Sequence, residues 1–137
     1  MKHDPKEQRS LFPEECLLRE IARQPRLSIG IPKENIEVET RLALTPEGVA
    51  IVTEEGHSVY VQRGAGEGMA YSDLQFSEAG AFMVDNASEV YGADIVLKIS
   101  PPTIAELNMM QDRSSILSML QLTNLSAEVI KLMIKKK

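Results

Sequence analysis

Apolar and polar residues follow two different periods along this chain. Short runs rich in Val, Ile and Leu predict strands, whereas apolar residues spaced three or four positions apart predict helices. Strands are predicted at 27–31, 57–62, 81–84, 93–100 and 115–122. Helices are predicted at 46–56, 72–80 and 86–92, from Thr103 to Met110, and in the last residues from Asn124 or Ser126 onwards.

Strands and helices alternate after the first 26 residues, and this order favours an α/β domain with a mostly parallel sheet and right-handed crossovers. Residue types at the boundaries support the assignment. Thr45 is the expected N-cap of the first helix, with Pro46 as its first residue and Gly56 as its end. Ser72 is the expected cap of the next helix. Ligands of such sheets bind at the carboxyl ends of the strands.

Residues 1–26 are expected to form a separate helical extension. Leu17, Leu18 and Ile21 share one face of a helix that begins near Pro13 and ends before Pro25. We expect this helix to pack on the domain or on a partner.

The carboxyl end is predicted to be a basic helix with no stop signal. Val129, Ile130 and Met133 have helical spacing, and the sequence ends at Lys137 without Gly, Asn or Pro. Such an ending fits a natural terminus or a chain cut from a longer protein.

Composition narrows the classes of function. The 137 residues suffice for one domain with a core, and 43% hydrophobic and 26% charged residues are ordinary for a soluble protein. A net charge of −5 argues against nucleic acid as a partner. A single cysteine predicts no internal disulfide framework, and two histidines far apart in sequence predict no metal site. No apolar run is long enough to span a membrane, so we predict no membrane contact. The N-terminus has no apolar secretion signal, so we expect a cytoplasmic protein.

Arg41 is the first candidate for chemistry, because it follows the first predicted strand. A guanidinium at that place is suited to clamp a carboxylate with two parallel N–H···O bonds. The alternative is a surface arginine paired with Glu37 or Glu39.

Lys98 is the second candidate, because lysine is unusual near the end of a buried type of strand. We expect it to reach a substrate or an acidic neighbour. The alternative is a lysine that emerges into water at the strand end. Ser100 ends the same segment, and Gln121 lies at the end of the last predicted strand, so both are further candidates to contact a ligand.

The glycine-rich segment 64–68, GAGEG, does not match the dinucleotide-binding fingerprint. That fingerprint is G-x-G-x-x-G between a strand and a helix, followed by an acidic residue about 20 positions on. Here the third glycine is one position early, and three residues separate it from the cap at Ser72. We predict a packed or flexible turn, and no site for a nicotinamide dinucleotide within this chain alone. His57 is expected to be structural, because it begins a strand.

Taken together, these segments resemble the amino-terminal domain of the alanine dehydrogenase and pyridine nucleotide transhydrogenase alpha-subunit family. The resemblance covers about residues 27–137 and rests on the motifs I-P-K-E, R-x-A-L-T-P, G-H-x-V-x-V, G-A-G-x-G, A-D-I-V-L-K and P-P. The combination is specific, although no single motif is. It implies a Rossmann-like (flavodoxin-like) three-layer domain at 27–137, cut off before the NAD-binding domain.

The resemblance also implies roles for the candidate residues. In the family's alanine dehydrogenases the arginine of R-x-A-x-T-P binds the substrate carboxylate, and that position is Arg41. Those enzymes read L-K-V-K-E-P, in which the second lysine contacts substrate; this chain reads LKISPP, with Ser100 at that place. Their catalytic histidine corresponds to Gln121, which cannot act as a general acid or base near neutral pH. The implied substrate-binding set is therefore Arg41, Lys98, Ser100 and Gln121, without a catalytic residue.

Three functions stay open. The first is an NAD-dependent alanine dehydrogenase, which converts L-alanine, NAD and water into pyruvate, ammonia and NADH, with this chain inactive on its own. The second is a transhydrogenase alpha-type domain, which lacks that lysine and histidine and passes hydride between nucleotides. The third is a catalytically degenerate binding or regulatory module. The family implies NAD bound mainly by a domain absent from this chain, and a homo-oligomer.

Overall fold

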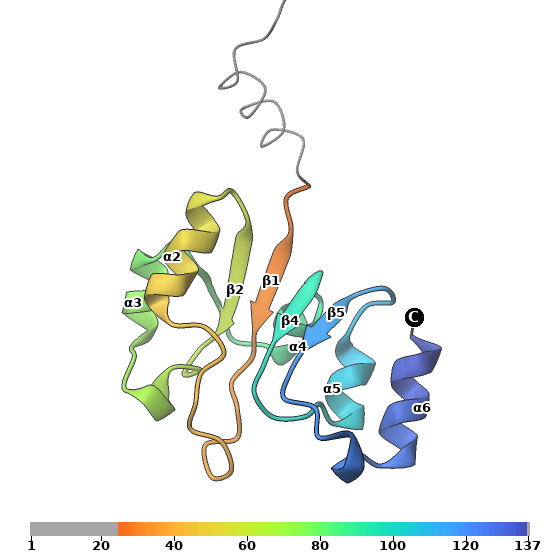
Figure 1. The fold of residues 1–137 in the computed structure, drawn as a ribbon. Coiled ribbons are helices and arrows are strands. Elements are labelled where there is room, and N and C mark those ends of the chain that lie inside the picture. Colours follow the sequence, from red (N-terminus) through yellow and green to blue (C-terminus); the bar gives the residue numbers. More distant parts are fainter. Residues whose placement is uncertain (1–24, 137) are drawn as a thin grey trace, which may run out of the picture.

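The computed structural model describes residues 25–136, which form one five-stranded parallel sheet with helices on both faces (Figure 1). The helix predicted near Leu17 lies outside the described residues. The strands are β1 (Ser28–Ile31), β2 (Ser58–Gln62), β3 (Phe82–Val84), β4 (Ile95–Leu97) and β5 (Ser115–Leu117). The helices are α2 (Pro46–Glu54), α3 (Asp73–Glu78), α4 (Ala87–Tyr91), α5 (Ile104–Met109) and α6 (Ala127–Lys135), with short 3-10 turns η1 (Glu67–Met69) and η2 (Leu122–Asn124).

The strand order is β3-β2-β1-β4-β5, so the chain reverses direction across the sheet after β3. The predicted α/β class and parallel sheet are confirmed. The order is the one found in Rossmann-type sheets, whereas a flavodoxin-like sheet would place its first strand between the second and third. Ligands of sheets with such a reversal bind beside it, which here means at the carboxyl ends of β1 and β4.

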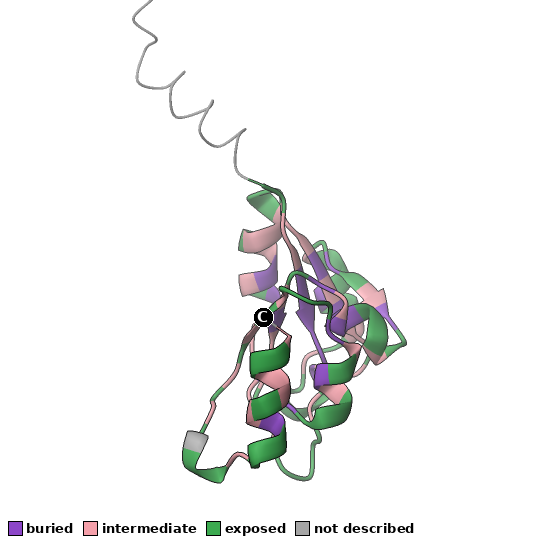
Figure 2. Cartoon of the chain, turned by 90° about the vertical axis from the view of Figure 1, so that its right-hand side faces the viewer, coloured by how far each residue is buried: buried purple, intermediate pink, exposed green. Residues whose placement is uncertain are grey.

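Two apolar clusters hold the layers together. On one face, Val49 of α2 and Phe76 of α3 pack on β1 and β2, where Val59 and Val61 are fully buried. On the other face, Tyr91 of α4 joins β4, α5 and α6 through Val96, Leu107 and Val129. Figure 2 shows the buried residues concentrated in the sheet and on the inner sides of the helices.

Gly30 sets the distance between β1 and α4. A Cβ atom at this position would lie 2.1 Å from the backbone oxygen of Val90. Only a residue without a side chain lets the helix backbone approach the central strand this closely.

The helix starts follow the predicted caps. The Thr45 hydroxyl accepts from the N–H of Gly48 at 3.4 Å. Ser72 and Thr103 each form a capping box with the residue three positions on. Ser126, one of the two predicted alternatives, caps α6.

Two strands are shorter than predicted. The segments 93–100 and 115–122 contribute only three strand residues each, β4 and β5. Pairing continues briefly, because Lys98 N–H donates to Leu117 O and Met119 N–H donates to Ile99 O, both at 3.0 Å. Pro101 and Pro102 have no N–H, so the ladder ends there.

Between residues 25 and 136, no helix has the length and apolar character that crossing a bilayer requires.

We predict that Gly30→Ala lowers the free energy of unfolding by about 3 kcal/mol, the upper end of the usual cost of overpacking. The added methyl group would force α4 away from β1. Urea denaturation of the 137-residue chain measures the effect. Gly92→Ala is the control, because a Cβ there is 3.2 Å from its nearest neighbour and φ is negative; its expected change is below about 1 kcal/mol. Equal stability of the two variants would contradict this account of the β1–α4 contact.

Candidate functional site

The carboxyl edge of the sheet brings together the loops that follow β1 and β4. β1 leads into Glu34, and β4 leads into Lys98 and Ser100. These loops lie where the strand order reverses, and the longer loop between β1 and α2 extends beyond the sheet edge (Figure 1).

Lys98 is buried at this edge and surrounded by carboxylates. Only 4% of its side chain is exposed, and its Nζ lies 3.0 Å from Glu106 Oε2 and 3.8 Å from Glu34 Oε2. Nζ also donates to Glu106 Oε1 at 3.0 Å. Of the alternatives raised by the sequence, the structure shows a lysine that reaches acidic neighbours.

Glu34 joins the β1 loop to the β4 loop. Its side chain is only 8% exposed, and its Oε1 accepts from the backbone N–H groups of Ile99 and Ser100. Its other oxygen faces Lys98. The turn that carries Ser100 is therefore fixed through Glu34 to the loop that begins at the end of β1.

Glu106 completes the cluster from the first turn of α5. Burial alone would raise the pKa of its carboxyl, but hydrogen bonds from the Thr103 N–H and Lys98, together with the nearby Tyr91 hydroxyl, outweigh burial and lower it. Burial, together with the nearby Glu106 carboxylate, raises the pKa of the Tyr91 hydroxyl, which stays protonated. The cluster thus holds a cation, two carboxylates and a neutral phenol in the interior.

The sequence pointed to Lys98 but not to its partners. Glu34 stands in the I-P-K-E motif, and Glu106 stands three positions after the cap Thr103, which is the spacing of a capping box. These patterns signal local structure. The contact between Glu34 and the β4 loop depends on the strand order, which local patterns do not reveal.

Arg41 lies on the loop between β1 and α2 and is bound to Glu39. Its Nε donates to Glu39 Oε1 at 2.8 Å, and its Nη2 donates to Glu39 Oε2 at 2.7 Å. The side chain of Arg41 remains 59% exposed, whereas that of Glu39 is 12% exposed. The structure thus shows the pairing of Arg41 with Glu39 that the sequence offered as an alternative. The guanidinium of Arg41 nevertheless still faces solvent.

The glycine-rich loop packs against the Arg41 loop. A Cβ at Gly68 would lie 2.5 Å from the backbone oxygen of Thr40, so the glycine permits a close backbone contact. Lys33 Nζ and Glu67 Oε2, 2.9 Å apart, form a second link between the two loops. The segment is a turn followed by η1, and it forms no helix that could bind a pyrophosphate at its N-terminus.

Ser100 and Gln121 have different surroundings. Ser100 is partly buried, and its N–H donates to Glu34 at 3.3 Å. Gln121 is exposed at the start of η2, and its side-chain oxygen accepts from Asn124 at 2.7 Å. Within residues 25–136, no hydrogen bond or ion pair joins Arg41 or Gln121 to the Lys98 cluster.

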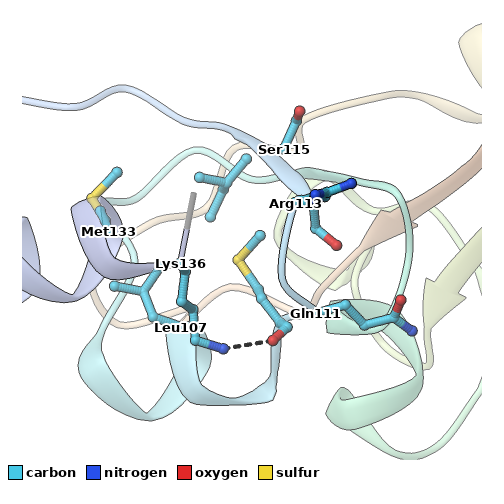
Figure 3. A pocket seen from close by; sticks show the side chains of 9 residues that line it. Leu107, Gln111, Arg113, Ser115, Met133 and Lys136 are labelled. Atoms are coloured by element: carbon cyan, nitrogen blue, oxygen red, sulfur yellow. Dashed lines mark hydrogen bonds between the residues drawn. The ribbon is translucent and has the colours of Figure 1, made fainter.

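A pocket of about 330 Å³ lies elsewhere, between α5, α6 and the start of β5 (Figure 3). Leu107, Met110 and Met133 give it apolar walls, and Lys136 Nζ donates to Met110 O at 2.6 Å beside it. None of the four candidate residues lines this pocket. It lies at the amino end of β5, away from the edge where ligands of parallel sheets bind.

Metal ligands are not gathered in this part of the protein. No group of three or more His, Cys, Asp or Glu residues between 25 and 136 is placed to hold an ion. His57 has a structural contact, because its Nδ1 accepts from the N–H of Leu27 at 3.2 Å.

We predict that Lys98→Met destabilises the chain by about 3–5 kcal/mol at pH 7, because two carboxylates would remain buried without a cation. The stability difference from wild type should narrow as pH falls below about 4.3. In the wild type the lowered pKa of Glu106 contributes stability above the unfolded value of about 4.3, and that contribution disappears as pH falls and the carboxyl protonates. Chemical denaturation at several pH values measures this.

Lys131→Met is the matched control for that experiment, because Lys131 is exposed on α6. Its expected change is within about 0.5 kcal/mol. A Lys98→Met variant as stable as this control would show that the buried cation is dispensable.

Proteins of known identity are similar to this chain in sequence and in fold. Over 97 residues the chain is 41% identical to the alanine dehydrogenase of Mycobacterium tuberculosis, covering 70% of this chain and 26% of that protein. The chain thus spans about a quarter of the length of the curated relatives it matches.

Two solved structures are similar. An L-alanine dehydrogenase superposes with a TM-score of 0.74 at 30% identity, covering 80% of this chain and 30% of that one. A transhydrogenase from Sinorhizobium meliloti superposes with a TM-score of 0.69 at 29% identity, covering 77% and 30%.

A family model described as the alanine dehydrogenase/PNT N-terminal domain matches residues 30–137. The match covers more than half of the chain and includes the end of β1, the other four strands, the Arg41 loop and the Lys98 cluster. The chain therefore belongs to the alanine dehydrogenase and pyridine nucleotide transhydrogenase family, as a domain of its amino-terminal type.

Proposed function

We propose that this chain is the substrate-binding, amino-terminal domain of an NAD-dependent alanine dehydrogenase-like oxidoreductase. The reaction would convert L-alanine, NAD and water into pyruvate, ammonia and NADH. The observation that carries the proposal is Arg41, a half-exposed guanidinium on the loop that follows the central strand, at the edge where such sheets bind ligands.

Arg41 would hold the carboxylate that alanine and pyruvate share. A guanidinium offers five N–H groups in a planar arrangement, and two parallel bonds to a carboxylate fix both its position and its orientation. Ser100 would add a hydrogen bond from the β4 side, and Gln121 another from η2. Neither brings a positive charge or a group that transfers protons near neutral pH, so proton transfer would fall to a group other than these two.

Lys98 would act beside the substrate rather than on it. Its Nζ is already shared by Glu34 and Glu106, and its side chain is almost fully buried. In this proposal it keeps Glu34 in place, and Glu34 in turn holds the Ser100 turn against the β1 loop.

NAD would be bound mainly by polypeptide outside this chain. The glycine-rich loop does not fit a dinucleotide, because Gly68 packs on Thr40 and no helix N-terminus follows the loop directly. Residues 27–137 would accordingly form the substrate half of a longer enzyme, with 1–26 as an extension. We further propose that the enzyme is a cytoplasmic homo-oligomer.

A second candidate is the corresponding domain of a transhydrogenase alpha subunit. The similarity to the Sinorhizobium meliloti transhydrogenase favours it, as do Ser100 and Gln121, which provide neither the second cation nor the base of an amino-acid pocket. Such a domain would take part in hydride transfer between NADH and NADP and would need no substrate carboxylate at Arg41.

In the full-length protein we predict that Arg41→Ala lowers kcat/KM for L-alanine by roughly 10²-fold or more, because a charged bidentate contact is lost. L-alanine-dependent formation of NADH measures it. Arg63→Ala is the matched control, an exposed arginine after β2 that pairs with Asp85, and should change kcat/KM less than about threefold.

Three results would each contradict a part of this proposal. Unchanged activity in Arg41→Ala would remove this residue from the site and contradict the proposed role. Hydride transfer between nucleotides without any response to L-alanine would support the transhydrogenase type instead. The 137-residue chain alone is expected to be inactive, and NADH formation by it would contradict the assignment of NAD to another domain.

A further inference from the structure

Glu39 and Arg41 form a closed ring of hydrogen bonds. Glu39 Oε1 accepts from both the backbone N–H of Arg41, at 2.9 Å, and its Nε, at 2.8 Å. Oε2 accepts from Nη2 at 2.7 Å. Three bonds between residues two positions apart leave the guanidinium little freedom to rotate.

The ring uses only one side of the guanidinium. Of the five N–H groups, Glu39 takes the one on Nε and one on Nη2. The edge formed by Nη1 and the remaining N–H of Nη2 has no hydrogen-bond partner among residues 25–136. That edge is a second fork with the spacing of a carboxylate.

We propose that Glu39 is a positioning residue for Arg41: it binds the side of the guanidinium and presents the opposite fork to the carboxylate of the substrate. This inference rests on the proposed function, because it assumes that Arg41 binds that carboxylate. A flexible arginine must lose its rotational freedom when substrate binds, whereas an arginine held by Glu39 has already lost it, which favours binding.

The backbone on both sides of the ring is also constrained. Thr40, between Glu39 and Arg41, packs its backbone on Gly68 of the glycine-rich loop. A few residues earlier, Lys33 is paired with Glu67 of the same loop. Two contacts to a neighbouring loop thus fix the segment whose side chains form the ring.

The charges stay in place over the working range of pH. The hydrogen bonds from Arg41 lower the pKa of Glu39 to about 2, and Glu39 raises the pKa of the guanidinium. Because neither group changes its charge between pH 5 and 9, the effect of Glu39 on substrate binding should be the same throughout that interval.

The competing possibility is that Glu39 blocks the site by occupying Arg41 in place of substrate. The two possibilities predict opposite changes in KM. If Glu39 positions Arg41, its removal weakens binding of L-alanine. If Glu39 competes with substrate, its removal strengthens binding.

The test compares Glu39→Gln and Glu39→Ala in the full-length protein with Glu37→Gln, an exposed neighbour that does not bind Arg41. We expect both Glu39 variants to raise KM for L-alanine about 5- to 10-fold, with kcat within about twofold and the ratio constant from pH 5 to 9. Glu37→Gln should leave KM unchanged. A KM that falls or stays the same in the Glu39 variants overturns the proposal.

A second measurement does not depend on activity. In the 137-residue chain, NMR of the Arg41 Nε–H should show slow exchange with water in the wild type and in Glu37→Gln, and fast exchange in Glu39→Ala. Slow exchange in Glu39→Ala would overturn the positioning role. If these NMR results hold but Arg41→Ala keeps full activity, the proposed function fails and the positioning role for substrate fails with it, although the ring itself exists.

Discussion

Lys98 is the buried charge around which the carboxyl edge of the sheet is arranged. A cation in the interior must be paired, because the cost of removing it from water is otherwise not offset. Lys98 meets this requirement with Glu34 from the β1 loop and Glu106 from α5. The Lys98 side chain, which follows β4, therefore links this strand to the loop after β1 and to helix α5.

The loops of the candidate site depend on this cluster in turn. Glu34 accepts from the backbone of Ile99 and Ser100, so the turn after β4 cannot move without disturbing the ion pairs. Farther along the same β1 loop, contacts with the glycine-rich loop and the ring of Glu39 and Arg41 leave an exposed guanidinium on a constrained backbone. The arrangement suits a site that binds a small anion, because the binding group has few conformations to lose.

Local features of the fold could be predicted from the sequence, and long-range contacts could not. Thr45 and Ser72 act through neighbours three residues away, so their caps were predicted correctly, and the helix start near Thr103 was predicted as well. Glu39 as a partner of Arg41 was also within reach of local reasoning. The partnership of Glu34 with the β4 loop was not, because it depends on β1 and β4 lying side by side. The ends of β4 and β5 were placed too late, since period and composition do not show where pairing with a neighbouring strand stops.

The central claim is that the guanidinium of Arg41, at the edge organised by Lys98, binds the substrate carboxylate. The most direct measurement is a crystal structure of the full-length protein with pyruvate. The account predicts the pyruvate carboxylate within hydrogen-bond distance of Nη1 and Nη2 of Arg41, with Glu39 still bound to Nε. Pyruvate bound away from Arg41, or a guanidinium turned away from the carboxyl ends of β1 and β4, would contradict it.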